Sequence, residues 1–283
     1  MQRPYGIDRV IMVILDGLRA DAIPLFPLPH LLRLARNSAY TLAGRTVRPS
    51  ITASALTSLL TGVTPRVHGV ESEQIAVHRP RGSLTPLPEV LARHGLGLRA
   101  FRGALPPLTV GVATRITERL GIEARFEGQR AVEVLAAATP TLSGRTPGVV
   151  VLHWLDADRA GHASGWGSPD YVRAAKHLDE ALGQLVESEA VLEDPATLLI
   201  AFADHGGGGA AAKDHNSPHP LDVTIPIILA GGQVLPGVLG DGASLLDIPA
   251  TAAWALGVPR PAQWSGRPLV EAFQLARAAA RAA

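Results

Sequence analysis

The chain has 283 residues, a formal net charge of +1 at pH 7 and no cysteine. The near-neutral charge gives no electrostatic reason to expect a nucleic-acid or membrane partner, and the lack of cysteine excludes disulfides, thiolate metal sites and a cysteine nucleophile. The apolar content of 47% is ample for a core, and no repeat or long linker divides the sequence, so we expect a single domain over residues 1–283.

The first apolar run, at residues 10–15, is too short for a signal-peptide core and leads directly into Asp16. No segment reaches the ~18 apolar residues that a membrane span needs. We therefore expect a cytoplasmic protein.

Short, continuous apolar runs alternate with helical patterns along the chain. A helix is expected from Thr52 to a glycine cap at Gly62, and helical patterns follow at residues 87–95 and 168–187. Buried parallel strands are expected at 10–15, 148–155, 197–203 and 225–231, with a weaker candidate at 97–103. This alternation predicts a three-layer α/β/α sandwich with a mostly parallel central sheet.

Acidic residues follow three of the predicted strands. Asp16 follows the first, Asp156 and Asp158 follow the strand at 148–155, and Asp204 follows the strand at 197–203. A single aspartate in such a place is as well explained by a helix cap or a turn. Ligands of open parallel sheets bind at the carboxyl ends of the strands, however, so three such endings indicate one shared site.

Histidines accompany these carboxylates. Asp158 and His162 are four residues apart, and Asp-His pairs occur at 204–205 and 214–215. The combined donors are Asp16, Asp158, His162, Asp204, His205 and His215. Oxygen and imidazole donors suit zinc or manganese, and six of them are too many for one tetrahedral zinc. Two divalent metal ions about 3.5–4 Å apart would use them all.

A hydroxyl cluster at residues 50–54 precedes the helix that ends at Gly62. Thr52 would lie at the N-terminus of this helix, where the dipole and free N–H groups favour an anion. The residue pattern alone leaves open whether Thr52, Ser50 or Ser54 is a nucleophile or a simple helix cap.

The sequence resembles the alkaline phosphatase superfamily and, within it, the type I phosphodiesterase/nucleotide pyrophosphatase branch. The resemblance lies in "VILDGLRAD", "TASALTSLLTGVTPRVHGV", "DADRAGH" and the segment from "ADHGG" to "IPIILAG". It implies a metal-dependent phosphoric ester hydrolase, with a phosphodiesterase favoured and a small-molecule phosphate ester as substrate. Phosphomonoesterase, sulfatase-like hydrolase and metal-binding pseudoenzyme are the alternatives.

The resemblance also implies roles for individual residues. Thr52, nine residues before Thr61-Gly62, would be the nucleophile and form a phospho-threonine intermediate. One metal would be held by Asp16, Thr52, Asp204 and His205, and the other by Asp158, His162 and His215, with His219 as the rival of His215.

The group that binds a phosphate oxygen is left open by the resemblance, with Ser54, Arg48 and Lys213 as candidates. The glycines at 206–209 are interpreted as leaving room for substrate and letting the next ligand fold back, or else as a flexible surface loop. His153 is interpreted as a hydrogen-bonded core histidine. Substrate specificity is expected to lie in residues 71–145.

Overall fold

A computed structural model describes residues 6–72 and 82–273, and the strands in these residues form one eight-stranded sheet. In sheet order the strands are β4 (Ile122–Phe126), β3 (Gly97–Arg102), β5 (Gly148–Trp154), β1 (Arg9–Leu15), β6 (Thr197–Phe202), β7 (Thr224–Ala230), β2 (Ala39–Arg45) and β8 (Gly237–Val238). Every residue of β1, β5 and β6 is buried, because helices cover both faces of the sheet there.

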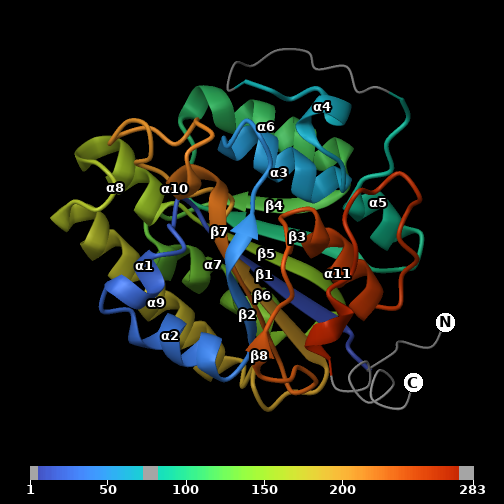
Figure 1. Ribbon diagram of the computed structural model, residues 1–283. Helices are drawn as coiled ribbons and strands as arrows, with labels where there is room; N and C mark the ends of the chain where they lie inside the picture. The colour runs from blue at the N-terminus through green and yellow to red at the C-terminus, as the bar shows by residue number, and fades with distance from the viewer. Residues whose placement is uncertain (1–5, 73–81, 274–283) are drawn as a thin grey trace.

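Helices form a layer on each side of this sheet (Figure 1). On one side, α2 (Pro29–Arg36) and α7 (Ala131–Ser143) pack on α9 (Pro169–Ser188), which also contacts α8 (Asp156–Ser164). On the other side, α3 (Thr52–Thr61) packs against α5 (Leu87–Ala92), α11 (Asp247–Ala255) and α4 (Pro65–His68). The remaining helical segments are α1 (Ala22–Leu25), α6 (Pro107–Arg119), α10 (Pro220–Val223) and the 3₁₀ turn η1 (Val270–Ala272). The predicted α/β/α architecture is thus confirmed.

The expectation that residues 225–231 form a parallel strand is wrong. Strand β7 is antiparallel to both of its neighbours, β6 and β2, whereas the other pairs of the sheet are parallel. The chain between β6 and β7 stays at one edge of the sheet instead of crossing over a face, and only an antiparallel strand can follow such a connection. The carboxyl end of β6 and the amino end of β7 therefore meet at the same edge.

Local signals account for the ends of the predicted helices. The Ser168 hydroxyl accepts a hydrogen bond from the Tyr171 N–H at the start of α9, and Gly62 ends α3 with φ +67°. Strands β2 and β4 escaped prediction because their buried residues alternate with exposed or half-buried ones, as expected near the margins of a sheet. Among the described residues, no helix combines the length and apolarity that crossing a membrane requires.

Candidate active site

Three aspartates meet at the carboxyl edge of the central strands. Asp16 directly follows β1, Asp204 lies two residues beyond β6, and Asp158 lies in the first turn of α8, which follows β5. The backbone joins them, because Asp158 N–H donates to the Asp16 carbonyl over 3.0 Å and Gly17 N–H donates to Asp204 Oδ1 over 3.3 Å. Gly17 has φ +70°, and a Cβ there would lie 2.8 Å from the Asp158 Cα, so only glycine permits this approach.

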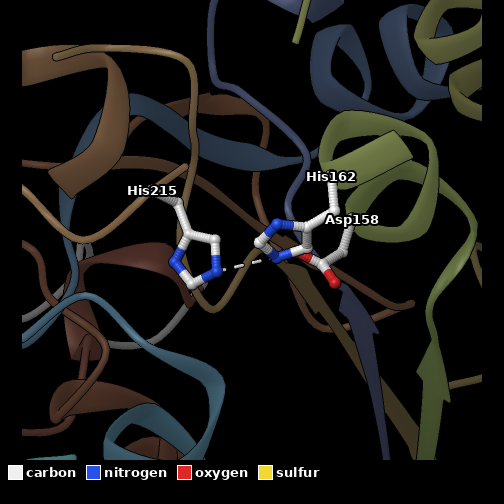
Figure 2. Close-up of side chains that lie close together, drawn as sticks. All are labelled: Asp158, His162 and His215. Atoms are coloured by element: carbon white, nitrogen blue, oxygen red, sulfur yellow. Dashed lines mark ion pairs between the residues drawn. The ribbon is translucent and has the colours of Figure 1, made fainter. Parts of the chain in front are cut away.

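Two groups of potential metal ligands result, and they divide the donors as the resemblance implied. Asp16, Asp204 and His205 form one group, and Asp158, His162 and His215 form the other, with the ligand atoms of each group within 4.8 Å of one another. Figure 2 shows the second group, in which Asp158 and His162 of α8 converge with His215 from the loop before β7.

The three histidines are oriented in the same way. Their Nδ1 atoms lie 2.9 Å, 3.0 Å and 2.6 Å from the backbone carbonyls of Gly206, Lys213 and Ser50, for His205, His162 and His215 respectively. A carbonyl only accepts, so each Nδ1 carries a proton, and in the neutral imidazole the lone pair is then on Nε2. Such contacts to the second nitrogen are typical of metal-ligating histidines.

The Nε2 atoms point at the carboxylates. His205 Nε2 lies 3.4 Å from Asp16 Oδ1 and 3.5 Å from Asp204 Oδ2, while His162 Nε2 lies 3.3 Å from Asp158 Oδ1. The rings of His205 and His215 stack with centroids 3.8 Å apart. Burial lowers the pKa of His215, which favours the neutral form of its imidazole.

Each aspartate also has one buried oxygen that receives no hydrogen bond from the described residues: Oδ1 of Asp16, Oδ1 of Asp158 and Oδ2 of Asp204. Burial, and then the charges of Asp204 and Asp158, raise the pKa of Asp16 well above its ordinary value. Unpaired buried carboxylate oxygens are costly, and a cation between them and the histidine Nε2 atoms would satisfy both. The donor set therefore fits divalent metal ions.

Thr52 is the first residue of α3 and is half-buried, so its side chain reaches both the site and solvent. Its Oγ1 lies 3.1 Å from His205 Nε2, which places the hydroxyl beside the group of Asp16, Asp204 and His205. The N–H groups of the first turn of α3 point out of the same helix end, where they favour an anion.

The glycines at 206–209 pack closely against neighbouring residues and do not form a loose surface loop. A Cβ on Gly207 would lie 2.2 Å from the indole of Trp166, and one on Gly206 would lie 1.9 Å from the Leu221 carbonyl. Gly209 is held by its N–H, which donates to Asp222 Oδ1 over 2.8 Å. These contacts pack the loop against Trp166, in the connection between α8 and α9, and against α10, and this packing returns the chain to the site at His215.

The three candidate substrate-binding residues, Ser54, Arg48 and Lys213, lie in different surroundings. Ser54 is buried and its hydroxyl donates to the Val70 carbonyl, and Lys213 Nζ donates to the Ala163 carbonyl at the end of α8. Arg48 is exposed and lines a cavity of about 360 Å³ together with Pro49, Asn216, Ser217 and Pro218. The cavity lined by Arg48 and Pro49 therefore adjoins the hydroxyl cluster at residues 50–54.

Two other residues that the sequence offered as possible site residues, His219 and Asp156, lie outside both ligand groups. The exposed His219 caps α10 by accepting a hydrogen bond from the Leu221 N–H, whereas His215 is in the cluster. Asp156 accepts from the Ala131 N–H over 3.0 Å, so it caps α7 as a structural residue.

His153 is directly hydrogen-bonded to a site residue, which its interpretation as a core histidine did not predict. It is buried and hydrogen-bonded, as expected of a core histidine, but its partner is Asp16, with Nε2 2.7 Å from Oδ2. Arg102 Nε donates to the other ring nitrogen of His153 over 3.2 Å. An imidazole within the otherwise apolar run "VVVLHWL" is the sequence signal that could have drawn attention to it.

Residues 10–77 and 98–225 match the type I phosphodiesterase / nucleotide pyrophosphatase family, so the chain belongs to that family and to the alkaline phosphatase superfamily. The matched segments span more than half of the chain and include the three aspartates and three histidines of both ligand groups.

Among curated proteins, it is similar to 2,3-bisphosphoglycerate-independent phosphoglycerate mutases. The enzyme of Synechococcus sp. (strain JA-2-3B'a(2-13)) is 31% identical over 150 residues, which are 50% of this chain and 27% of the mutase. That of Listeria monocytogenes serotype 4b (strain F2365) is 30% identical over 142 residues, covering 50% and 26%. The chain thus matches about a quarter of the length of these relatives.

Solved structures share the fold at low sequence identity. Human ectonucleotide pyrophosphatase / phosphodiesterase 5 superposes with a TM-score of 0.73 at 15% identity, over 94% of this chain and 99% of that one. The phosphonate monoester hydrolase of Silicibacter pomeroyi gives 0.65 at 17% identity, over 93% and 76%. A sulfatase of Bacteroides thetaiotaomicron gives 0.71 at 15% identity, over 94% and 76%.

Proposed function

We propose that this chain is a two-metal phosphodiesterase that acts on small-molecule phosphate esters, with Thr52 as its nucleophile. The observation that carries the proposal is the convergence of three lone-pair-bearing histidine Nε2 atoms on three buried, unpaired carboxylate oxygens, beside an accessible hydroxyl. Family membership supports ester hydrolysis, and a murine relative of the same fold was solved in complex with AMP.

The two ligand groups are proposed to hold two divalent cations. Asp16, Asp204 and His205, with Thr52, would hold one, and Asp158, His162 and His215 the other. Zinc is favoured by the three imidazoles, and manganese is the alternative. When bound, the cations would supply positive charge to the attacking, leaving and non-bridging oxygens of the phosphate.

The chain's own residues define the rest of the reaction. Thr52 loses its hydroxyl proton to water, and its Oγ1 attacks phosphorus. A bond from phosphorus to Oγ1 forms, the bond to the leaving oxygen on the opposite side breaks, and the expelled alkoxide takes up a proton from water. The N–H groups at the start of α3 stabilise negative charge on the transferred group. Water then cleaves the phospho-threonine and restores the Thr52 hydroxyl.

We propose that the protein carries out this activity in the cytoplasm.

A substrate panel tests the proposal. Protein reconstituted with zinc or manganese would be offered p-nitrophenyl monophosphate, a p-nitrophenyl phosphodiester, a p-nitrophenyl phosphonate and p-nitrophenyl sulfate. We expect the diester to be hydrolysed with the highest kcat/KM. A preference for the monophosphate or the sulfate would replace the proposed activity with that one, and no turnover of any ester would reject hydrolysis in favour of a pseudoenzyme.

Thr52→Ala should lower kcat by at least about 10³-fold while the protein keeps its metals, because it removes a covalent catalyst. Thr57→Ala is the matched control, since the Thr57 hydroxyl lies on the same helix and donates to the Ala53 carbonyl. Acid quenching should trap phosphate on Thr52, and phosphate found on Ser50 or Ser54 would contradict the assignment.

A further inference from the structure

Arg102, His153 and Asp16 lie in a row across three neighbouring strands, close to the edge that carries the site. Arg102, the last residue of β3, is in register with His153 of β5. His153 is in register with Ile14 of β1, two residues before Asp16. The row therefore runs from β3 through β5 to the end of β1, where Asp16 joins it to the group formed by Asp16, Asp204 and His205.

The hydrogen bonds of this row have one possible direction. A guanidinium only donates, so the 3.2 Å contact makes His153 Nδ1 the acceptor of the Arg102 Nε–H. The ring proton of the neutral imidazole is then on Nε2 and is donated to Asp16 Oδ2 over 2.7 Å. Arg102 thus selects the tautomer of His153 that can donate to Asp16.

This arrangement distinguishes the two oxygens of Asp16. Oδ2 is occupied by His153, whereas Oδ1 is buried, has no hydrogen-bond partner among the described residues and lies 3.4 Å from His205 Nε2. One oxygen is therefore held toward the sheet and the other toward the proposed cation.

Packing alone does not explain His153 and Arg102. The rest of β5 is apolar, and a leucine at position 153 would fill an apolar strand without burying an imidazole. Arg102 places a positive charge where it interacts with all three site carboxylates, Asp16, Asp204 and Asp158. The Arg102 guanidinium, at the end of β3, thereby offsets part of the repulsion among these three carboxylates.

We propose that His153, oriented by Arg102, is a positioning residue that fixes Asp16 as a ligand through Oδ1 alone and so sets the affinity of one of the two metal sites. The inference rests on the proposed two-metal function, but it concerns binding and not turnover. Partners that hold a ligating side chain typically contribute 10–100-fold to metal affinity.

Zinc affinity of the metal-free full chain, measured by competition with a chromophoric chelator, tests the proposal. His153→Leu should weaken one zinc site by about 10–100-fold and leave the other within a few-fold of wild type. His153→Gln should stay near wild type, because the glutamine Nε2 can take the place of the histidine Nε2 and donate to Asp16. A role in packing alone predicts the opposite order, with leucine tolerated and glutamine harmful.

Two further variants complete the experiment. Arg102→Leu should weaken the same zinc site, and it tests the row independently if His153→Leu does not fold. His68→Leu is the matched control, because His68 is a buried histidine that bonds to Ser58 and the Val70 N–H outside the site. It should alter neither zinc constant.

The outcomes separate this inference from the proposed function. Two zinc ions with the predicted shift, but no ester hydrolysis by wild type, would reject the phosphodiesterase and keep the positioning role. Unchanged zinc affinity in folded His153→Leu and Arg102→Leu would overturn the positioning role, as would a wild-type chain that binds no zinc.

Discussion

At the scale of single residues, the structure separates candidates that the sequence could only group together. Arg48 and Lys213 are both cations near proposed site residues, but Lys213 Nζ is occupied by the Ala163 carbonyl, and the Lys213 carbonyl accepts from His162 Nδ1. The backbone of Lys213 therefore orients His162, a proposed metal ligand, while its side chain caps α8. Arg48 lines an open cavity and has no ion pair among those found in the described residues.

Arg48→Ala should raise KM for an anionic ester by about 10-fold, because a hydrogen bond to a charged group contributes ~1.5–3 kcal/mol. Lys213→Ala is the paired comparison and should stay within about threefold of wild type in kcat/KM, since alanine keeps the carbonyl that orients His162. Steady-state kinetics on both variants checks the distinction. A large loss in Lys213→Ala with no change in Arg48→Ala would reverse the assignment.

At the scale of elements, the segment between β6 and β7 organises the site. It leaves β6 with Asp204 and His205, folds over Trp166 and brings His215 back to the same edge. The Ser50 hydroxyl donates to the His215 carbonyl, so this segment is also tied to the strand-to-helix connection that carries Thr52. The glycines matter because the loop passes so close to a large side chain.

Gly207→Ala should therefore destabilise the protein and weaken metal binding at the group that contains His215. The added Cβ would meet the Trp166 indole at 2.2 Å, and overpacking of this kind costs typically 1–3 kcal/mol. Gly111→Ala is the matched control, because Gly111 lies within α6 with nothing near its Cβ position, and alanine there should stabilise slightly. Thermal unfolding and zinc titration measure both effects; equal melting temperatures for the two variants would refute the packing argument.

At the scale of the whole molecule, the sheet brings three carboxylates together and leaves each with an unpaired buried oxygen. Such a site opposes folding when it is empty of metal, and metal binding returns that free energy because the unfolded chain has no such site. Stability and metal binding are therefore coupled through Asp16, whose pKa is raised well above 3.8 by burial and by Asp204 and Asp158.

Asp16→Asn should stabilise the metal-free protein, because it removes a buried charge while keeping an oxygen for the His153 N–H. A relief of about 1 kcal/mol would raise the melting temperature by about 2 °C in a chain of this length. The variant should also lose most of the stabilisation that zinc gives to wild type. Asp156→Asn, at a buried aspartate outside the site, is the control and should keep the zinc effect.

The difference in unfolding free energy between metal-free Asp16→Asn and metal-free wild type should depend on pH with a defined sign. Above the folded-state pKa of Asp16, the wild type carries the unfavourable charge, so the stability advantage of metal-free Asp16→Asn should be greatest there. The advantage should shrink as pH falls through that pKa toward 3.8, because folded wild type takes up a proton before the unfolded chain does. Unfolding free energies at several pH values check this, and an advantage that grows on acidification would contradict it.

The sequence by itself determined the fold class, the central strands and the family, because buried strands leave continuous apolar runs and ligand residues recur at local spacings such as Asp158 and His162. It also proposed a division of the donors into two groups that matches the geometry. Local patterns could not decide the direction of β7, the contacts of the glycine loop or the link from Arg102 through His153 to Asp16. These depend on strand order and on atoms far apart in the chain that meet only after folding, and only the tertiary structure places them together.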